Sequence, residues 1–137
     1  MLILDFKRAF NWGILVVSDA GAAMPEFDGH ATHDGPILAS SARALVVRVR
    51  HASDRDDDAV DADGHLLPTE VRVEVSMGRG GQSTVDHVLA ISSGEVLIGD
   101  AEGEAPMIVP PGSYRVAVEV DDQEFAELVR LFFERVA

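Results

Sequence analysis

Two short segments carry residue types that could bind a divalent metal ion. In the first, His30 and His33 lie within a run of seven residues that also holds Asp28 and Asp34. Imidazole and carboxylate groups are typical ligands of zinc and related ions. The run has the composition of a loop, with no helix to place both imidazoles on one face. An exposed polar loop is therefore the favoured interpretation, and a metal site is the alternative.

The second segment, residues 59–70, matches a calcium-binding EF-hand loop at several positions. It departs from that loop at Ala59, where the ion needs a carboxylate, and at Pro68, and no amphipathic helices flank it. A simple turn at Asp63-Gly64 explains the same pattern. The alternative metal ligands of the two segments are His30, His33, Asp61, Asp63 and Glu70.

Hydroxyl and imidazole groups that could support hydrolysis occur near expected strand ends. Ser18, Ser92 and Ser93 are candidate nucleophiles, and His51 or His87 could serve as the general base. The sequence around the serines has no nucleophile-elbow motif, and His87 lies in a strand pattern that favours a hydrogen-bonded edge residue. A hydrolase with a serine–histidine pair thus stays an alternative, and no catalytic residue is predicted.

Acidic residues set the electrostatic character of the chain. Its 24 Asp and Glu against 11 Lys and Arg give a formal net charge of −13. This charge argues against nucleic acids and anionic membranes as partners, because both would repel the protein. Two acidic clusters either keep the chain soluble or attract a basic protein partner. The candidate partner-binding residues are Asp54, Asp56, Asp57, Asp58, Asp61, Asp63, Glu119, Asp121, Asp122 and Glu124.

Length and composition indicate one domain over residues 1–137. The absence of cysteine excludes disulfides and thiolate metal sites and fits a reducing cytoplasm. Charged residues interrupt the apolar start of the chain, and its longest apolar run is too short to span a bilayer. We therefore expect a cytoplasmic protein with no cofactor.

The elements that must position these side chains are predicted as strands. Apolar residues alternate with polar ones in residues 71–75 and, from Val47 onward, in residues 44–51, and residues 12–19 form the apolar run of a central strand. The first two segments are expected to pair as a hairpin with the acidic loop 53–68 at its end. Residues 86–120 are expected to hold three more strands, separated by turn residues.

The C-terminal segment 124–136 permits two assignments. Its apolar residues have helical spacing, which favours a helix slightly, whereas the dense apolar run 128–133 suits a buried closing strand. Trp12 and Tyr114 are expected in the core or at its edge, with hydrogen-bond partners for their polar ends.

The order of these pieces resembles a family of small bacterial β-sandwich proteins around competence protein J, which inhibits a nuclease. The resemblance covers most of the chain except the acidic loop, implies a sandwich, and favours a strand at the C-terminus. It implies no catalytic residues. The matching pieces are residues 12–19, 86–90, 93–98, 110–116 and 128–132.

We therefore predict an all-β protein, a two-sheet antiparallel β-sandwich of roughly seven to nine strands. By analogy with the nuclease-inhibiting relative, the predicted function is that of a non-enzymatic, inhibitor-like or immunity-like protein that binds a basic protein partner such as a nuclease. The alternatives are a divalent-cation or small-ligand binding module and a hydrolase.

Overall fold

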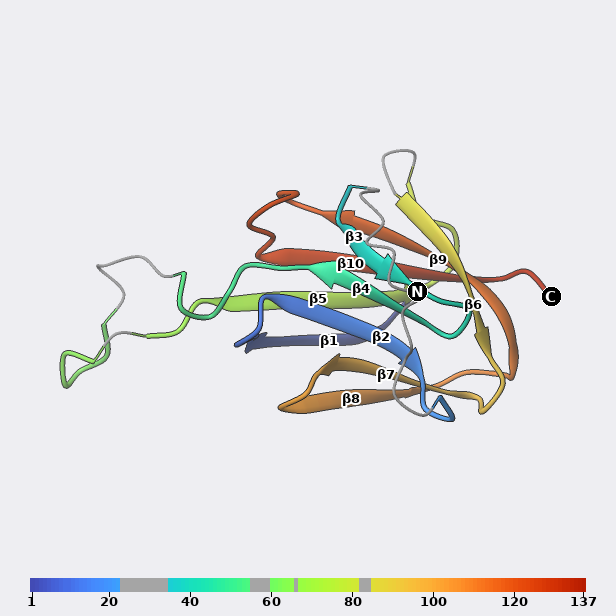
Figure 1. Cartoon of the computed structure of the whole chain (residues 1–137), viewed down its shortest axis with the longest axis horizontal. Helices are drawn as coiled ribbons and strands as arrows, with labels where there is room; N and C mark the ends of the chain where they lie inside the picture. The colour runs from blue at the N-terminus through green and yellow to red at the C-terminus, as the bar shows by residue number, and fades with distance from the viewer. Residues whose placement is uncertain (23–34, 55–59, 66, 82–84) are drawn as a thin grey trace.

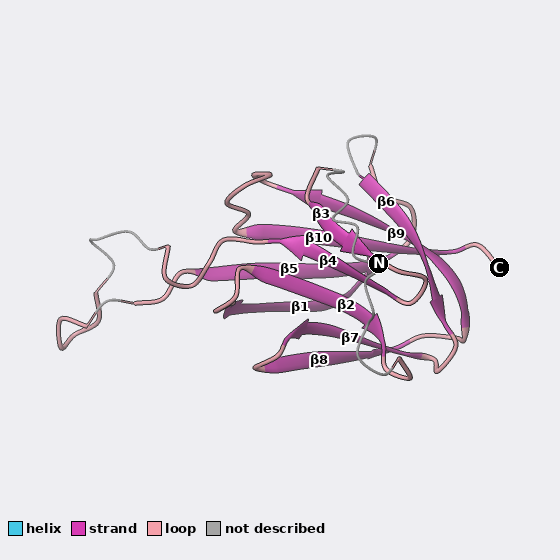
Figure 2. Cartoon of the chain, viewed as in Figure 1, coloured by secondary structure: helices cyan, strands magenta, loops and turns pink. Residues whose placement is uncertain are grey.

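The computed structural model describes residues 1–22, 35–54, 60–65, 67–81 and 85–137. These residues form ten strands and no helix (Figure 2), and hence no helix that could span a membrane. In chain order the strands are β1 (Leu2–Ala9), β2 (Ile14–Asp19), β3 (Ile37–Ser40), β4 (Ala44–Arg48), β5 (Glu70–Met77), β6 (Val85–Ile91), β7 (Glu95–Asp100), β8 (Gly103–Ile108), β9 (Gly112–Val120) and β10 (Leu128–Arg135).

The strands form two five-stranded sheets that pack face to face (Figure 1). Sheet I has the order β1-β5-β10-β9-β6, and sheet II has the order β3-β4-β2-β7-β8. All neighbours are antiparallel except β5 and β10, which run parallel. The predicted all-β sandwich is confirmed, with ten strands in the described residues instead of seven to nine.

Alternating side chains build the core between the sheets. In β5 and β10, side chains such as Val73 and Leu131 are fully buried, while Arg72 and Arg130 between the buried positions face solvent. Tyr114 is also fully buried, packs edge-on against Phe133 with ring centroids 6.2 Å apart, and donates its hydroxyl hydrogen to the carbonyl of Pro110. The expectation for Tyr114 is confirmed.

The expectation for Trp12 is wrong, because its side chain is 64% exposed in the turn between β1 and β2. The count of strands in residues 86–120 is also wrong, since that segment holds β8 in addition to the three expected strands. Gly103 and Pro106 weaken the strand pattern of β8. Proline is tolerated there because β8 lies at the edge of sheet II.

The predicted hairpin of residues 44–51 with residues 71–75 does not form. β4 belongs to sheet II and β5 to sheet I, so the two segments lie in different layers. Alternation of apolar residues identifies the buried face of a strand but not its neighbour. The C-terminal segment forms β10 in sheet I, so the strand assignment is correct and the helical spacing has no structural counterpart.

Arg8 links the two sheets at the edge where β1 faces β8. Its guanidinium donates to the carbonyl of Gly103 and to Oδ1 of Asp100, each over 2.6 Å, and lies 4.6 Å from the ring centroid of Phe10. Asp100 is 4% exposed, and its Oδ2 has no hydrogen-bond partner within the described part of the chain. The buried carboxylate therefore depends on Arg8 for its charge compensation.

We predict that Arg8→Ala lowers the free energy of unfolding by about 3 kcal/mol, because it leaves the Asp100 carboxylate buried without a counter-ion. The same change in an Asp100→Asn background should cost clearly less, since no charge is then left unpaired. Denaturant titration of the four proteins measures both costs. Equal costs in the two backgrounds would show that the ion pair contributes nothing to stability.

Candidate functional site

Between β4 and β5 the chain leaves the sandwich at one end, and the described residues 60–65 lie well beyond it (Figure 1). We call residues 51–69 the acidic arm. The end of the sandwich from which the arm projects is called the arm end. Residues 60–65 form the outer part of the arm (Figure 1), and the side chains of Asp61 and Asp63 within them are exposed. Asp54 contacts Arg50, next to the start of the arm. The candidate residues Asp56, Asp57 and Asp58 fall outside the described residues.

The outer part of the arm contains a turn held by Asp61. Its Oδ1 accepts hydrogen bonds from the backbone N–H groups of Asp63 and His65, each over 2.9 Å, and Gly64 adopts a φ of 83°. The turn interpretation is thereby confirmed. The ligand atoms of Asp61, Asp63 and His65 lie within 4.8 Å of one another, but all three side chains are exposed.

The alternative metal-ligand set is not brought together in the described structure. Glu70 begins β5 and pairs with Ala9, so it belongs to the sheet and not to the turn of the arm. His30 and His33 lie outside the described residues. Asp61, Asp63 and His65 lie close together because they form one local turn. The hydrogen bonds of that turn explain its geometry without a bound ion.

Backbone hydrogen bonds fix the base of the arm to the sandwich. The N–H of Val49 donates to the carbonyl of Gly13 over 3.1 Å, and the N–H of Ala52 donates to the carbonyl of Phe10 over 3.0 Å. At the other end of the arm, just before β5, Thr69 donates its N–H to the carbonyl of Ala52 over 3.0 Å. The arm therefore starts from a defined position beside the β1–β2 turn.

Arg50 joins the arm to the loop between β9 and β10, residues 121–127. The guanidinium of Arg50 contacts the carboxylates of Asp54 over 3.3 Å and Glu127 over 3.2 Å. The backbone N–H of Arg50 donates to the backbone carbonyl of Ala126 over 3.0 Å. The two acidic clusters, which are far apart in the sequence, thus meet at the arm end. Sequence patterns offer no signal for this contact, because it joins segments that are far apart in the sequence.

The acids of the 121–127 loop also shape its backbone. Oδ1 of Asp121 accepts hydrogen bonds from the N–H groups of Glu127 and Leu128, and Oδ1 of Asp122 accepts them from Phe125 and Glu124. The bonds from Phe125 and Glu124 lower the pKa of Asp122, so this carboxylate is ionised at neutral pH. Glu124 is exposed.

A groove of about 640 Å³ lies at the base of the arm. One wall of the groove consists of Leu67, Pro68 and Thr69 of the arm. The other wall includes Lys7 of β1 and Glu70 of β5, two strands of sheet I. Arg50 and Glu127 also line it, so the groove continues directly into the contact between the arm and the 121–127 loop.

Acids on the solvent face of sheet I are in a different situation, because arginines neutralise them. Arg72 contacts Asp5 over 2.8 Å and Glu74 over 3.4 Å. Arg130 then contacts Glu74 over 3.4 Å and Glu119 over 3.2 Å, so one chain of alternating charges crosses four strands. Glu119, a candidate partner-binding residue, belongs to this series of ion pairs and not to the 121–127 loop.

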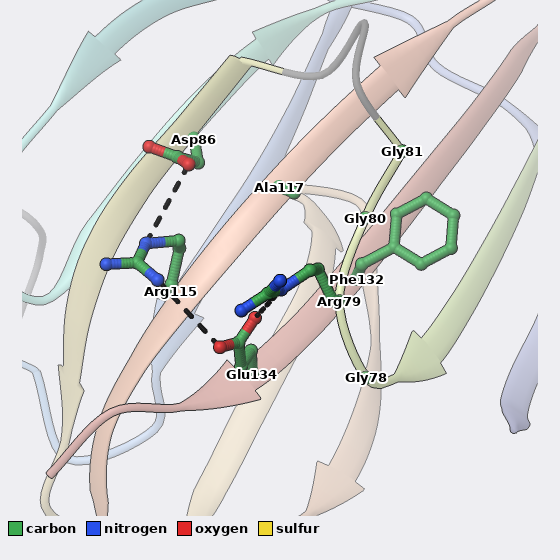
Figure 3. A pocket seen from close by; sticks show the side chains of 9 residues that line it. All are labelled: Gly78, Arg79, Gly80, Gly81, Asp86, Arg115, Ala117, Phe132 and Glu134. Atoms are coloured by element: carbon green, nitrogen blue, oxygen red, sulfur yellow. Dashed lines mark hydrogen bonds and ion pairs between the residues drawn. The ribbon is translucent and has the colours of Figure 1, made fainter.

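A second chain of charges crosses the same face (Figure 3). Arg115 contacts Asp86 over 3.8 Å and Glu134 over 3.9 Å, and Arg79 contacts Glu134 over 3.5 Å. These side chains line a groove of about 310 Å³ next to Gly78. By contrast, residues 53–70 hold seven acids and one arginine, and residues 121–127 hold four acids and no cation. By sequence, the arm and the 121–127 loop therefore carry a larger excess of acids over cations than this face of sheet I does.

Two of the serines considered for hydrolysis, Ser92 and Ser93, contact a buried carboxylate at the opposite end of the sandwich, and the third, Ser18, lies within β2. Asp19 is 1% exposed and accepts hydrogen bonds from the hydroxyls of Ser92 and Ser93 and from the guanidinium of Arg43. His87 donates from Nε2 to the carbonyl of Ser41 over 2.8 Å, as expected for a hydrogen-bonded edge residue.

His51 lies at the arm end, where its Nδ1 contacts the hydroxyl of Ser53 over 2.7 Å. This is a local contact between exposed residues. Ser92 and Ser93, by contrast, stabilise Asp19, and neither His51 nor His87 contacts them in the described structure. The arrangement is that of a structural carboxylate and not of a serine nucleophile with its base.

Asp19 provides a test of this structural role. Burial raises its pKa, but hydrogen bonds from Ser93, Arg43 and the N–H of Gly21 outweigh that effect and lower the pKa to about 2. A depressed pKa contributes stability above the unfolded-state value near 4, and that contribution is lost as the pH falls through about 2.

We predict that wild type exceeds Asp19→Asn in free energy of unfolding by about 2 kcal/mol at pH 5 or above, and that the difference shrinks between pH 4 and pH 2. Other carboxylates titrate in both proteins, so the difference isolates Asp19. Denaturant titrations across this pH range measure it. A difference that does not change with pH would contradict the assigned role of the carboxylate.

No protein-family model matches the sequence, and no curated protein matches it. Among solved structures, the fold is similar to that of ComJ from Bacillus subtilis, an inhibitor of the DNA-degrading activity of NucA, with a TM-score of 0.65 and 10% identity over 99% of this chain and 98% of that chain. A structure described as crocagin biosynthetic gene J gives a TM-score of 0.49 and 11% identity over 94% of each chain. The likeness to ComJ confirms, at the level of the fold, the resemblance inferred from the sequence.

Proposed function

We propose that this protein is a non-enzymatic inhibitor that binds a basic protein partner, with a nuclease as the first candidate, through its arm end. The observation that carries the proposal is the contact of Arg50 with both Asp54 and Glu127, which unites two acidic segments on one surface. The fold shared with ComJ, an inhibitor of a nuclease activity, supports the same function.

The electrostatic argument depends on where the charge is compensated. Ion pairs cancel most of the field of the sheet I face, such as that of Glu74 between Arg72 and Arg130. The arm and the 121–127 loop carry acids with few cations, so their fields add. A surface of this kind accelerates the approach of a basic protein and repels DNA, which suits an inhibitor that competes with DNA for a cationic nuclease site.

Site-specific photo-crosslinking in the native cell tests the proposal. A crosslinking residue at His65, in the outer part of the arm, should capture a basic protein, whereas one at Ile108 on the last residue of β8 should not. The side chain of His65 and the residue Ile108 are each 77% exposed, so both positions are accessible to a partner. The purified chain should then inhibit DNA hydrolysis by the captured protein. Capture only from Ile108, or of an acidic protein, would refute the proposal.

We further predict that Asp63→Lys slows association with the captured partner by roughly threefold or more at low salt, because it reverses a charge in the steering surface. Glu95→Lys makes the same change in net charge at the opposite end and should have little effect. Stopped-flow kinetics across a salt series measure both variants, and their rates should converge as salt screens the field. Equal slowing by both variants would mean that only the net charge matters.

A further inference from the structure

Trp12 is the chain's one tryptophan, and a defined turn holds it in solvent. The N–H of Gly13 donates to the carbonyl of Phe10 over 3.3 Å, and Gly13 takes a φ of 67° that favours glycine. The side chain of Asn11 donates to Glu102 in the neighbouring β7–β8 turn. The indole is thus presented from a turn that is fixed on both sides.

Further exposed apolar side chains lie at the same end. Phe125, in the 121–127 loop, is 53% exposed, and Leu67, in the wall of the arm groove, is 44% exposed. Residues 49–52 connect these elements, because Val49 bonds to the Trp12 turn and Arg50 bonds to the loop of Phe125. Apolar side chains are therefore interspersed with the acidic segments around one junction.

Large aromatic side chains surrounded by polar residues are the usual composition of energetic hot spots in protein interfaces. A single exposed apolar residue needs no such explanation. Here the exposed side chains share one end with two segments rich in acids and poor in cations, which favour a cationic partner by charge complementarity. Acids accelerate the encounter, while burial of an indole slows dissociation.

We propose that Trp12 is the apolar anchor of the arm end and that it inserts into an apolar pocket bordered by Lys and Arg on the basic protein partner. The inference rests on the proposed function and specifies the partner surface that the arm end fits. Trp12 supplies the contact area, and the acids of the arm and of the 121–127 loop supply the attraction to the basic rim of the pocket. Phe125 and Leu67 extend the apolar contact.

Two synthetic peptides of equal length and charge serve as probes. One consists of six lysines separated by glycine, and in the other two of the glycines are replaced by leucine. The leucine-containing peptide should bind wild type about tenfold more tightly, an effect equal to partial burial of one apolar side chain. It should also shift the emission of Trp12 to shorter wavelengths, as expected when an exposed indole leaves water.

Trp12→Ala should lose the preference for the leucine-containing peptide, and Ile108→Ala should keep it, although Ile108 is the more exposed side chain. Calorimetric titration measures the affinities of the variants, and circular dichroism checks that they remain folded. A preference that survives in Trp12→Ala, equal affinity of wild type for both peptides, or binding of neither would overturn the inference.

The outcomes separate this inference from the proposed function. Equal, salt-dependent binding of both peptides would remove the anchor but leave the acidic surface intact, and crosslinking from His65 decides on the inhibitor function independently. Emission that shifts to shorter wavelengths on raising the protein concentration, with no peptide present, would assign Trp12 to self-association and would likewise overturn the inference.

Discussion

The parallel pairing of β10 with β5 determines where the acidic segments of this protein lie. Leu128 pairs with Arg72, so the two strands begin at the same end of sheet I. The arm leads into β5 and the 121–127 loop leads into β10, and parallel strands place their preceding segments side by side. An antiparallel arrangement of these strands would have put the two acidic segments at opposite ends of the sandwich.

Charge is distributed according to the same topology. Sheet I presents cross-strand pairs such as Arg130 with Glu119, each of which contributes at most about 1 kcal/mol because it is exposed to solvent. Their larger effect is to cancel opposite charges across one broad face. Buried carboxylates are handled differently, since Asp19 and Asp100 each have an arginine partner. The excess of acids over cations in the sequence is instead largest in the arm and the 121–127 loop.

Strand patterns in the sequence were sufficient to predict the sandwich, because the alternation in residues 71–75 and 114–120 directly reflects burial on one face. They were not sufficient to predict strand neighbours, because the two segments expected to pair as a hairpin lie in different sheets. The edge strand β8 was missed because Pro106 breaks the expected pattern. The expected burial of Trp12 was wrong for another reason. Aromatic side chains are buried on average, and this residue departs from that average.

A chain with a net charge of −13 must limit its own repulsion in order to fold. Carrying acids on an arm that extends from the sandwich is one physical solution, because charges more than about 8 Å apart are largely screened at physiological ionic strength. The same solution makes those acids available to a partner. Solubility and recognition are therefore compatible uses of this charge, and the exposed indole of Trp12 beside the base of the arm is the feature that solubility alone does not explain.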